Sequence, residues 1–385
     1  MNGRNKRIII FRILTNVGFL PFIWRGVGIH SDVTISQSYF SLLSKDLPAV
    51  TKWYLFRSEE LEKMLNSKKH SFTSKKFLST LSASLAVGFG YTLMKIFGRI
   101  YFLKRVYIFF SRIPAQQEHG FYDDTSTNVS VQLLDGAEVN DVVRDIKALG
   151  YSTKIRLNDF CIESILQYAN NERCYAYGDP NLGFYLSEKI NCEKVIGKEI
   201  LAAKYLDFQG KSAFDDFIKS PVLDAIAKGY LGSGAQNIGT QLWWNYPADV
   251  DVATRSKAAL FFHRDVDAWG FVKFFFYLSD VGLGGGPHVY VEASHKPSTL
   301  SQILSERLRI NRHSDASIRN RFGDASVKSF YGTAGAGIAA DTFGFHKGES
   351  PEINPRLMLC AVYATKDYGL QDFVSNEITP SAYDA

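Results

Sequence analysis

Residues 261–296 read FFHRDVDAWGFVKFFFYLSDVGLGGGPHVYVEASHK, and this stretch decides the fold. Two runs within it, 270–280 and 287–294, are short, rich in aromatic and branched side chains, and bounded by Gly, Pro, Asp or Ser, which is typical of strands. His263 and Asp265 come before them and are two positions apart, so both side chains point to the same side of an extended chain. The stretch therefore predicts β-structure with polar groups gathered where a strand ends.

Segments on either side extend the same pattern. Further strand-like runs occupy 240–247, 258–265, 336–344 and 355–365. A helical insertion at about 297–330 divides them. Short strands in this number predict a jelly roll. Ahead of them, 118–235 is expected to be a mostly helical lead-in, because apolar residues recur there at helical spacing.

The composition allows a large core. The chain has 385 residues, of which 46% are hydrophobic and 22% charged. We predict an α+β fold in two regions: a basic, apolar and helical N-terminal region over 1–115, and a jelly-roll domain with its lead-in over 116–385. The four cysteines form no CxxC pair, which favours a cytoplasmic location. Arg12 interrupts the apolar N-terminal run, so no cleaved signal peptide is predicted.

The N-terminal region is basic over 63–112, since no Asp or Glu occurs between Glu62 and Glu118. The run 77–94 carries no charge, although Ser, Thr and Gly dilute its hydrophobicity. Three interpretations stay open: a helix pair packed on the jelly roll, a segment lying on an anionic membrane surface, and a membrane span. The second would place a cytoplasmic protein at the inner face of a membrane. Nucleic acid is not expected as a partner, because no recognised binding motif accompanies the cations.

Two imidazoles and one carboxylate make a candidate metal site. His346 lies in DTFGFHKG, where Gly344 and Gly348 predict a tight turn that exposes the imidazole. With His263 and Asp265 it completes the set of ligands that holds a non-haem ferrous ion and leaves positions open. An HxD triplet or a loop histidine alone is more often an ordinary surface feature, so the prediction depends on the combination.

Arg356 opens an apolar, strand-like run ten residues after His346. A buried guanidinium needs a carboxylate partner, either a structural Asp or Glu or the carboxylate of a ligand. Its rigid fork suits a carboxylate well. Iron beside such an arginine indicates oxidation by O2 with 2-oxoglutarate as the cosubstrate.

Lys273 and Gln241 are weaker candidates for binding the cosubstrate. By strand alternation Lys273 shares a face with Phe271 and Phe275, and it either contacts a ligand or pairs with an acid such as Asp341. Gln241 precedes a tryptophan pair, and it either binds the cosubstrate or is an edge-strand polar residue. His288 and His295 are interpreted as structural or pocket-rim residues, because the triad already has two histidines.

These features together resemble the phytanoyl-CoA dioxygenase-like branch of the Fe(II)- and 2-oxoglutarate-dependent oxygenases, over about 140–365. The resemblance is carried by HRD at 263–265, by FVKFFFYLSDV and GGGPHVYVEASHK after it, and by the FHKG and NPR motifs downstream. Where the family usually has a Pro-Gly-Ser-His turn, this chain has Glu-Ala-Ser-His, a departure that would reshape the pocket wall.

The resemblance implies a double-stranded β-helix, with iron held by His263, Asp265 and His346. It also implies that Arg356 binds the distal carboxylate of 2-oxoglutarate. Related halogenases replace the carboxylate ligand with a small residue, so the intact Asp265 favours hydroxylation.

The leading hypothesis is therefore an oxygenase that hydroxylates a small or conjugated organic molecule. The basic N-terminal region suggests a lipid-linked or envelope-glycan precursor as the substrate. The alternative is a membrane-associated binding or scaffold protein with a non-catalytic jelly-roll pocket. The intact triad and Arg356 argue against it, because a binding module has no need of all four residues.

Overall fold

The computed structural model describes residues 90–111 apart from 92, 96 and 99, and then residues 130–206, 208, 210–257, 259–296 and 312–368. Residues 93–385 form one compact unit, to which the elements below belong. The domain boundary predicted near residue 115 stays a prediction, because the segment around it lies outside the described residues.

Nine antiparallel strands form the larger of two sheets. In sheet order they are β1 (Val131–Leu133), β2 (Tyr151–Leu157), β10 (Ala336–Ala340), β7 (Phe271–Tyr277), β12 (Arg356–Ala364), β6 (Gln236–Asn245), β5 (Ala202–Tyr205), β3 (Cys174–Ala176) and β4 (Gly183–Phe184). β12 lies between β7 and β6, and all of its residues are buried. Burial on both faces explains why its sequence is apolar without interruption.

The smaller sheet contains β11 (His346–Gly348), β8 (His288–Val291) and β9 (Val327–Phe330). The segment around His263 extends it, since His263 bridges to His346 and Phe262 bridges to His313. Side chains alternate between the two faces of this sheet. On the outer face Phe262, Val289, Val291 and Phe345 pack with Ile318 of α13 (Asp315–Phe322). The histidines between these positions therefore face the larger sheet, which completes the predicted jelly roll, a double-stranded β-helix.

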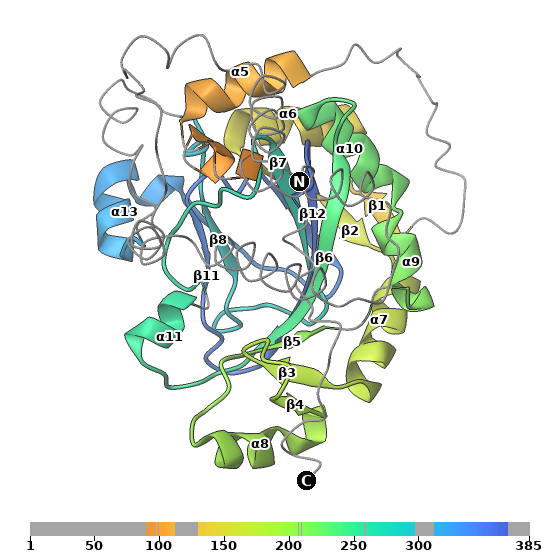
Figure 1. Ribbon diagram of the computed structural model, residues 1–385, viewed down its shortest axis with the longest axis vertical. Coiled ribbons are helices and arrows are strands. Elements are labelled where there is room, and N and C mark those ends of the chain that lie inside the picture. The colour runs from red at the N-terminus through yellow and green to blue at the C-terminus, as the bar shows by residue number, and fades with distance from the viewer. Residues whose placement is uncertain are drawn as a thin grey trace, which may run out of the picture. The chain divides into compact units, whose positions relative to one another are not determined.

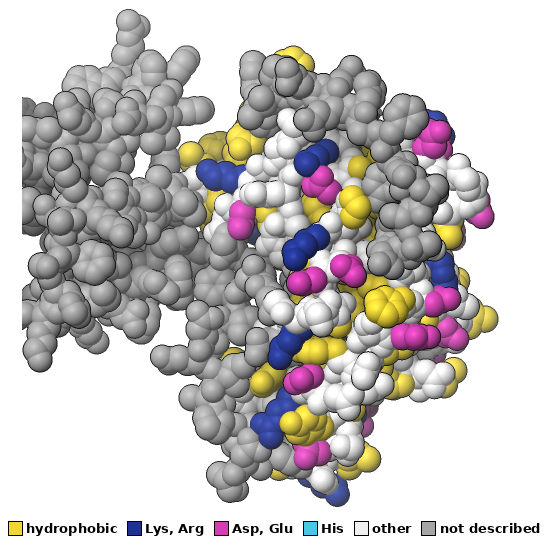
Figure 2. All heavy atoms as spheres, turned by 90° about the vertical axis from the view of Figure 1, so that its right-hand side faces the viewer, with side chains coloured by type: hydrophobic (Ala, Val, Ile, Leu, Met, Phe, Trp, Pro, Cys, Tyr) yellow, Lys and Arg dark blue, Asp and Glu magenta, His cyan; other side chains and the backbone are white. Residues whose placement is uncertain are grey.

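A layer of helices covers the outer face of the larger sheet (Figure 1). It comprises α6 (Val139–Leu149), α7 (Asp159–Asn171), α9 (Ser212–Ile218) and α10 (Pro221–Leu231). Their buried side chains pack on alternate strand residues, among them Phe274, Phe276 and Leu359. The outer side of the layer carries charges of both signs interspersed (Figure 2), such as Lys228 beside Asp224 at 2.7 Å. The alternate residues that the helices leave uncovered face the smaller sheet and line the interior of the barrel.

The lead-in differs from the mostly helical prediction for 118–235. β1 to β5 lie within this range and extend both ends of the larger sheet, between α6, α7, α8 (Lys189–Ile196), α9 and α10. β3 is buried at all three positions and β4 at both. Strands so short and so fully buried show no polar and apolar alternation, which is why the sequence pattern missed them.

Helix α5 (Tyr101–Ser111) packs on the jelly-roll unit. The Nζ of its Lys104 lies 3.5 Å from Asp341 Oδ1, and Tyr107 stacks on Trp269 with ring centroids 4.9 Å apart. These contacts favour the first of the three interpretations for this part of the basic segment. No helix among the described residues is both long enough and apolar enough to cross a bilayer. Most of the uncharged run 77–94 lies outside the described residues.

The predicted insertion at about 297–330 contains α13, the single turn η2 (Asp324–Ser326) and β9. Residues 297–311 lie outside the described residues. α11 (Val252–Lys257) connects β6 to the segment that carries His263.

Candidate metal centre

Backbone pairing in the smaller sheet brings His263 and His346 together. The N–H of each residue donates to the carbonyl of the other at 3.0 Å. Directly paired residues of antiparallel strands point to the same face, and the two imidazole centroids are 4.3 Å apart. The N–H of Asp265 donates to the carbonyl of Thr342 at 2.9 Å, which fixes the third side chain beside them.

The three side chains converge on one point. His263 Nε2 lies 3.6 Å from Asp265 Oδ1, and His346 Nε2 lies 3.3 Å from Asp265 Oδ2. One ligand atom from each residue falls within 4.8 Å of the other two. Atoms that share one face of a coordination sphere with bonds of about 2.1 Å lie about 3 Å apart. The spacing therefore fits a single metal ion with one face left open.

The histidines are held in the form that binds metal. His263 Nδ1 lies 2.9 Å from the carbonyl of Phe261, and His346 Nδ1 lies 3.0 Å from the carbonyl of Gly344. A carbonyl at Nδ1 keeps the proton there, so the Nε2 lone pair faces Asp265. Burial, together with the neighbouring His346, lowers the pKa of His263 to about 3. The ring is therefore neutral at pH 7.

Lys273 holds the carboxylate in its ionised form. Its Nζ lies 2.9 Å from Asp265 Oδ2 and 2.8 Å from Asp267 Oδ2. Burial opposes the ionisation of Asp265, but the adjacent ammonium of Lys273 outweighs it and holds the pKa of that carboxyl well below its usual range. Ligation needs the deprotonated carboxylate.

Lys273 pairs with an acid, which was one of its two predicted alternatives, but the acid is not the suggested Asp341. Lys273 pairs with two acids that lie six and eight positions before it in the chain. Asp341 instead pairs with Lys104 of α5 and accepts a hydrogen bond from Tyr230 at 2.6 Å. Residues 101–111 were assigned to a separate N-terminal region, so the sequence offered no reason to bring Lys104 there.

Arg356 is buried without an acid. Its side chain starts β12 and faces the barrel interior, and 3% of the residue is exposed. Nη2 donates to Asn245 Oδ1 at 2.7 Å, while Nε and Nη1 are buried and have no hydrogen-bond partner among the described residues. Burial lowers the pKa of Arg356 to about 10, so the group is still charged at pH 7. Arg356 had two predicted partners, a structural acid and the carboxylate of a ligand. The described residues provide no structural acid beside it.

The surroundings of Arg356 hold its guanidinium close to β11. Trp243 Nε1 donates to the same Asn245 oxygen at 2.9 Å, which holds the amide in place. A Cβ on Gly348 would lie 3.2 Å from Arg356 Nη2, so glycine lets the guanidinium lie against β11. Gly348 is two residues from His346 on the same face of that strand. Arg356, which starts β12, therefore reaches β11 two residues from the ligand His346.

Gln241 lies on the same interior face of the larger sheet, opposite Cys360 of β12 and two residues before Trp243. Trp244 instead packs with the helix-side core. Gln241 lies four residues along β6 from Asn245, the partner of Arg356, and a contact with a cosubstrate stays a prediction.

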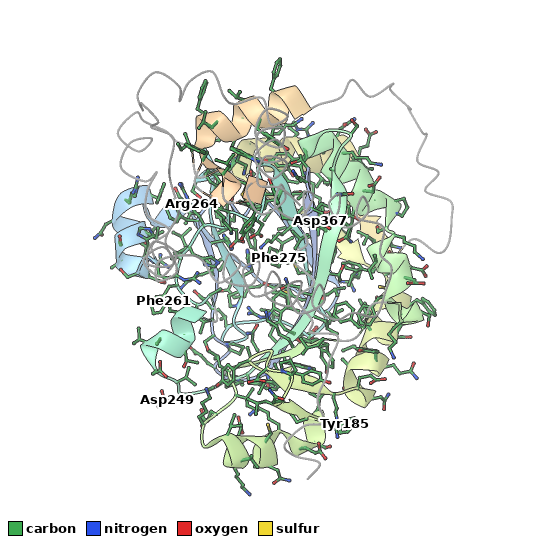
Figure 3. The ribbon with its side chains drawn as sticks, viewed as in Figure 1. Tyr185, Asp249, Phe261, Arg264, Phe275 and Asp367 are labelled. Atoms are coloured by element: carbon green, nitrogen blue, oxygen red, sulfur yellow. The ribbon has the colours of Figure 1, made fainter. Side chains whose placement is uncertain are left out.

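His288, interpreted from the sequence as a structural or pocket-rim residue, lies inside the barrel. Its ring stacks near Phe275 and Phe330, with centroids 4.7 and 6.3 Å away, and Phe275 lies near the middle of the barrel (Figure 3). The ring centroid of His346 is 5.7 Å away. Nε2 is buried and has no hydrogen-bond partner among the described residues. Alternation along 287–294 would have placed this histidine on the face opposite Val289, and so inside the barrel.

Burial, His346 and Arg356 hold the pKa of His288 well below its usual range, so its ring is neutral. It pairs with Gly348 in register, which places it between His346 and Arg356 along β11. His295 is not part of this group. It lies in the turn after β8, where its Nδ1 is 2.7 Å from the position that a Cβ on Gly150 would take.

Three solved structures illustrate the proteins to which this fold is similar. They are the non-heme alpha-ketoglutarate-dependent epimerase SnoN of nogalamycin biosynthesis, HygX from Streptomyces hygroscopicus with nickel and 2-oxoglutarate bound, and EctD from S. alaskensis with 2-oxoglutarate and 5-hydroxyectoine. Their TM-scores are 0.37, 0.40 and 0.37, at 14%, 15% and 15% identity. The alignments cover 59%, 59% and 62% of this chain and 82%, 87% and 84% of theirs. No protein-family model and no curated protein sequence matches the chain.

Proposed function

We propose that this protein is an Fe(II)- and 2-oxoglutarate-dependent oxygenase that uses O2 to hydroxylate a small or conjugated organic molecule. One observation carries the proposal: a triad of two histidines and an ionised aspartate shares the barrel with a buried arginine that has no acid partner among the described residues. The triad suits a ferrous ion with open positions, and the arginine suits the carboxylate of a ligand bound to it.

Each residue has a separate task in this proposal. His263, Asp265 and His346 bind the metal, and Lys273 orients Asp265 through its second oxygen. Arg356, held by Asn245, binds the distal carboxylate of 2-oxoglutarate. The metal and the oxo acid, when bound, supply the oxidising chemistry that converts a C–H bond to an alcohol while the oxo acid becomes succinate and carbon dioxide.

His288 adds a polar contact to the cosubstrate pocket. It lies between the metal-binding end and Arg356, and its unpartnered Nε2 is a neutral group that can donate to or accept from a bound oxo acid. Phe275 and Phe330 flank the ring and keep water from it. A dry pocket strengthens the pairing of carboxylate and guanidinium.

Hydroxylation is the outcome we propose within this class, because Asp265 fills the ligand position that the related halogenases leave empty. The resemblance to the phytanoyl-CoA dioxygenase-like branch supports the same outcome. A lipid-linked or envelope-glycan precursor stays the substrate suggested by the basic N-terminal segment.

Anaerobic titration tests the proposal. Fe(II) followed by 2-oxoglutarate should produce a visible absorption band, and aerobic incubation should release succinate. His263→Ala and Asp265→Ala should abolish both signals, whereas Asp324→Ala, which removes an exposed carboxylate on η2, should leave them unchanged. A wild-type protein that binds neither the metal nor the oxo acid would falsify the proposal.

One observation supports association of the protein with a membrane surface. Phe102 and Phe109 are 65% and 69% exposed and lie two turns apart on α5, on the side away from the buried Lys104 and Ile108. Exposed aromatic rings on a helix within a stretch free of acids suit the surface of an anionic membrane. We therefore propose peripheral docking through residues 63–112 as an addition to the enzyme activity.

A further inference from the structure

Arg312 lies directly beside the metal centre. The N–H of His313 donates to the carbonyl of Phe262 at 2.9 Å, and these two residues form an antiparallel bridge. Continued by one residue, the same register sets Arg312 opposite His263. Paired residues share a face, so Arg312 projects to the same interior side as His263, at the edge of the smaller sheet.

The Asp265 carboxylate is the charged group that acts on Arg312: burial lowers the pKa of the guanidinium, and Asp265 opposes that lowering. Arg312 is exposed, so its guanidinium lies at the opening of the site and is not part of its floor.

No acid neutralises Arg312 within the described part of the chain, since no carboxylate oxygen lies within 4.0 Å of it there. Two other cations near the centre are paired. Lys273 pairs with Asp265 and Asp267, and Lys347, on the outer face of β11, pairs with Asp315 at 2.8 Å.

A centre that holds the metal and 2-oxoglutarate would have no negative charge left over to neutralise Arg312. A divalent metal, Lys273 and Arg356 together carry four positive charges. Asp265, Asp267 and the two carboxylates of 2-oxoglutarate carry four negative charges. The centre and its cosubstrate are thus balanced, and Arg312 remains as a positive charge at the opening.

Lys204 adds a second cation on the interior side. Its neighbours Ala203 and Tyr205 pack with the helix-side core, so Lys204 points the other way, in register with Trp243. No acid lies within 4.0 Å of it among the described residues. Its side chain is exposed, so the amine lies at the surface on that side of the sheet.

We propose that the substrate carries an anionic group, a carboxylate or a phosphate, that pairs with Arg312 while the carbon to be oxidised lies over the metal. This inference rests on the proposed function, because it takes the centre as loaded with metal and 2-oxoglutarate. It names the class of substrate: a small anionic molecule, as opposed to a neutral sugar or lipid.

The test uses matched pairs of probes on the protein loaded with Ni(II) and 2-oxoglutarate, which binds without turning over. Each pair keeps one carbon skeleton: a carboxylate against its primary amide, and a phosphate monoester against its parent alcohol. Ligand-observed NMR gives the affinities. We expect at least one anionic member to bind about tenfold more tightly than its neutral partner, as a charge-assisted hydrogen bond to Arg312 would give. Whether the carboxylate or the phosphate series shows the preference identifies the anion.

Variants decide whether Arg312 is responsible. Arg312→Gln should remove the anion preference and Arg312→Lys should retain most of it, while Arg319→Gln, on the exposed side of α13, should not change it. The Ni(II) affinity of each variant reports that the site is folded. Anionic probes that bind no better than their neutral partners, or a preference that survives Arg312→Gln, would overturn the inference. A wild-type protein that fails to take up Ni(II) and 2-oxoglutarate would instead overturn the proposed function, so the two failures are distinguishable.

Discussion

The ammonium of Lys273 lies 2.9 Å from Asp265 Oδ2, the same oxygen that lies 3.3 Å from His346 Nε2. Lys273 also lies 2.8 Å from Asp267, so one lysine neutralises two carboxylates inside the barrel. The cation and the metal therefore stabilise the same charge, and removing one should increase the protein's dependence on the other.

Lys273→Met should destabilise the metal-free protein by about 3 kcal/mol, because it leaves two partly buried carboxylates without a counter-charge. A divalent metal should then stabilise the variant more than it stabilises the wild type, since the metal restores positive charge beside Asp265. Thermal unfolding with and without Ni(II) measures both effects. Lys328→Met, at a more exposed pair, serves as the control. Equal stabilisation of both proteins by the metal would contradict the assignment.

Arg356→Met should separate stability from binding. The buried guanidinium is costly without a carboxylate, so the metal-free variant should unfold at the same temperature as the wild type or higher. The affinity for 2-oxoglutarate should fall by about 100-fold, as expected when a bidentate charge-assisted contact is lost. If the substitution lowers the free energy of unfolding markedly, Arg356 has a structural partner after all.

His288→Phe should weaken 2-oxoglutarate binding by about tenfold, the value of one hydrogen bond to a charged group, and leave the metal affinity intact. Titration of the Fe(II) protein with 2-oxoglutarate, followed by absorption, gives both constants. Phe330→Leu disturbs the ring packing on His288 but removes no polar atom, so it should have little effect on cosubstrate affinity. The prediction is wrong if His288→Phe binds the oxo acid as tightly as the wild type.

Asp341 should make the fold sensitive to acid. Burial opposes its ionisation, but Lys104, His295 and the hydrogen bond from Tyr230 prevail and lower the pKa of this carboxyl. A carboxyl group whose pKa is lower in the folded state than in the unfolded state stabilises the fold at any pH above its unfolded-state pKa of about 3.9. This stabilisation is lost as the pH falls through the folded-state pKa. The free energy of unfolding of the wild type should therefore exceed that of Asp341→Asn at pH 7, and the gap should narrow below about pH 4. Urea unfolding across this range measures the gap, and a constant difference would exclude Asp341 as the cause.

Phe102→Ser combined with Phe109→Ser should reduce pelleting of the full chain with anionic vesicles and leave succinate formation unchanged, because both rings point away from the metal centre. Neutral vesicles give the baseline. If the wild type does not pellet with anionic vesicles above that baseline, peripheral docking is ruled out.

Strand periodicity predicted much of the fold and brought the candidate ligands to one place. His263 and Asp265 end a strand-like run and Arg356 opens one, so alternation fixes the side to which each points. The prediction of a tight turn that exposes His346 is wrong, because this residue starts β11 and is buried. The structure brings the three candidate ligands within ligand distance of one another and shows no acid beside Arg356 among the described residues, where the sequence had left a structural acid and a ligand carboxylate both open.

The parts that the sequence missed depend on pairings between distant segments. Arg312 lies on the side of His263 because Phe262 pairs with His313, although β7 and β8 separate the two in the chain, and no local pattern encodes that register. Lys104 reaches Asp341 over 237 positions for the same reason. The short strands of the lead-in were missed because they are buried on both faces and lack alternation.

The closeness of Gly348 to Arg356 has a consequence for which oxo acids fit. The metal-binding end and the guanidinium are two residues apart along β11, and an extended chain advances about 3.3 Å per residue. The two groups are therefore separated by roughly 7 Å along the strand. This separation is comparable to the distance between the two ends of a five-carbon diacid. With one end at the metal, a four-carbon homologue would be too short to reach the guanidinium. A six-carbon homologue would have to bend to fit between the two groups.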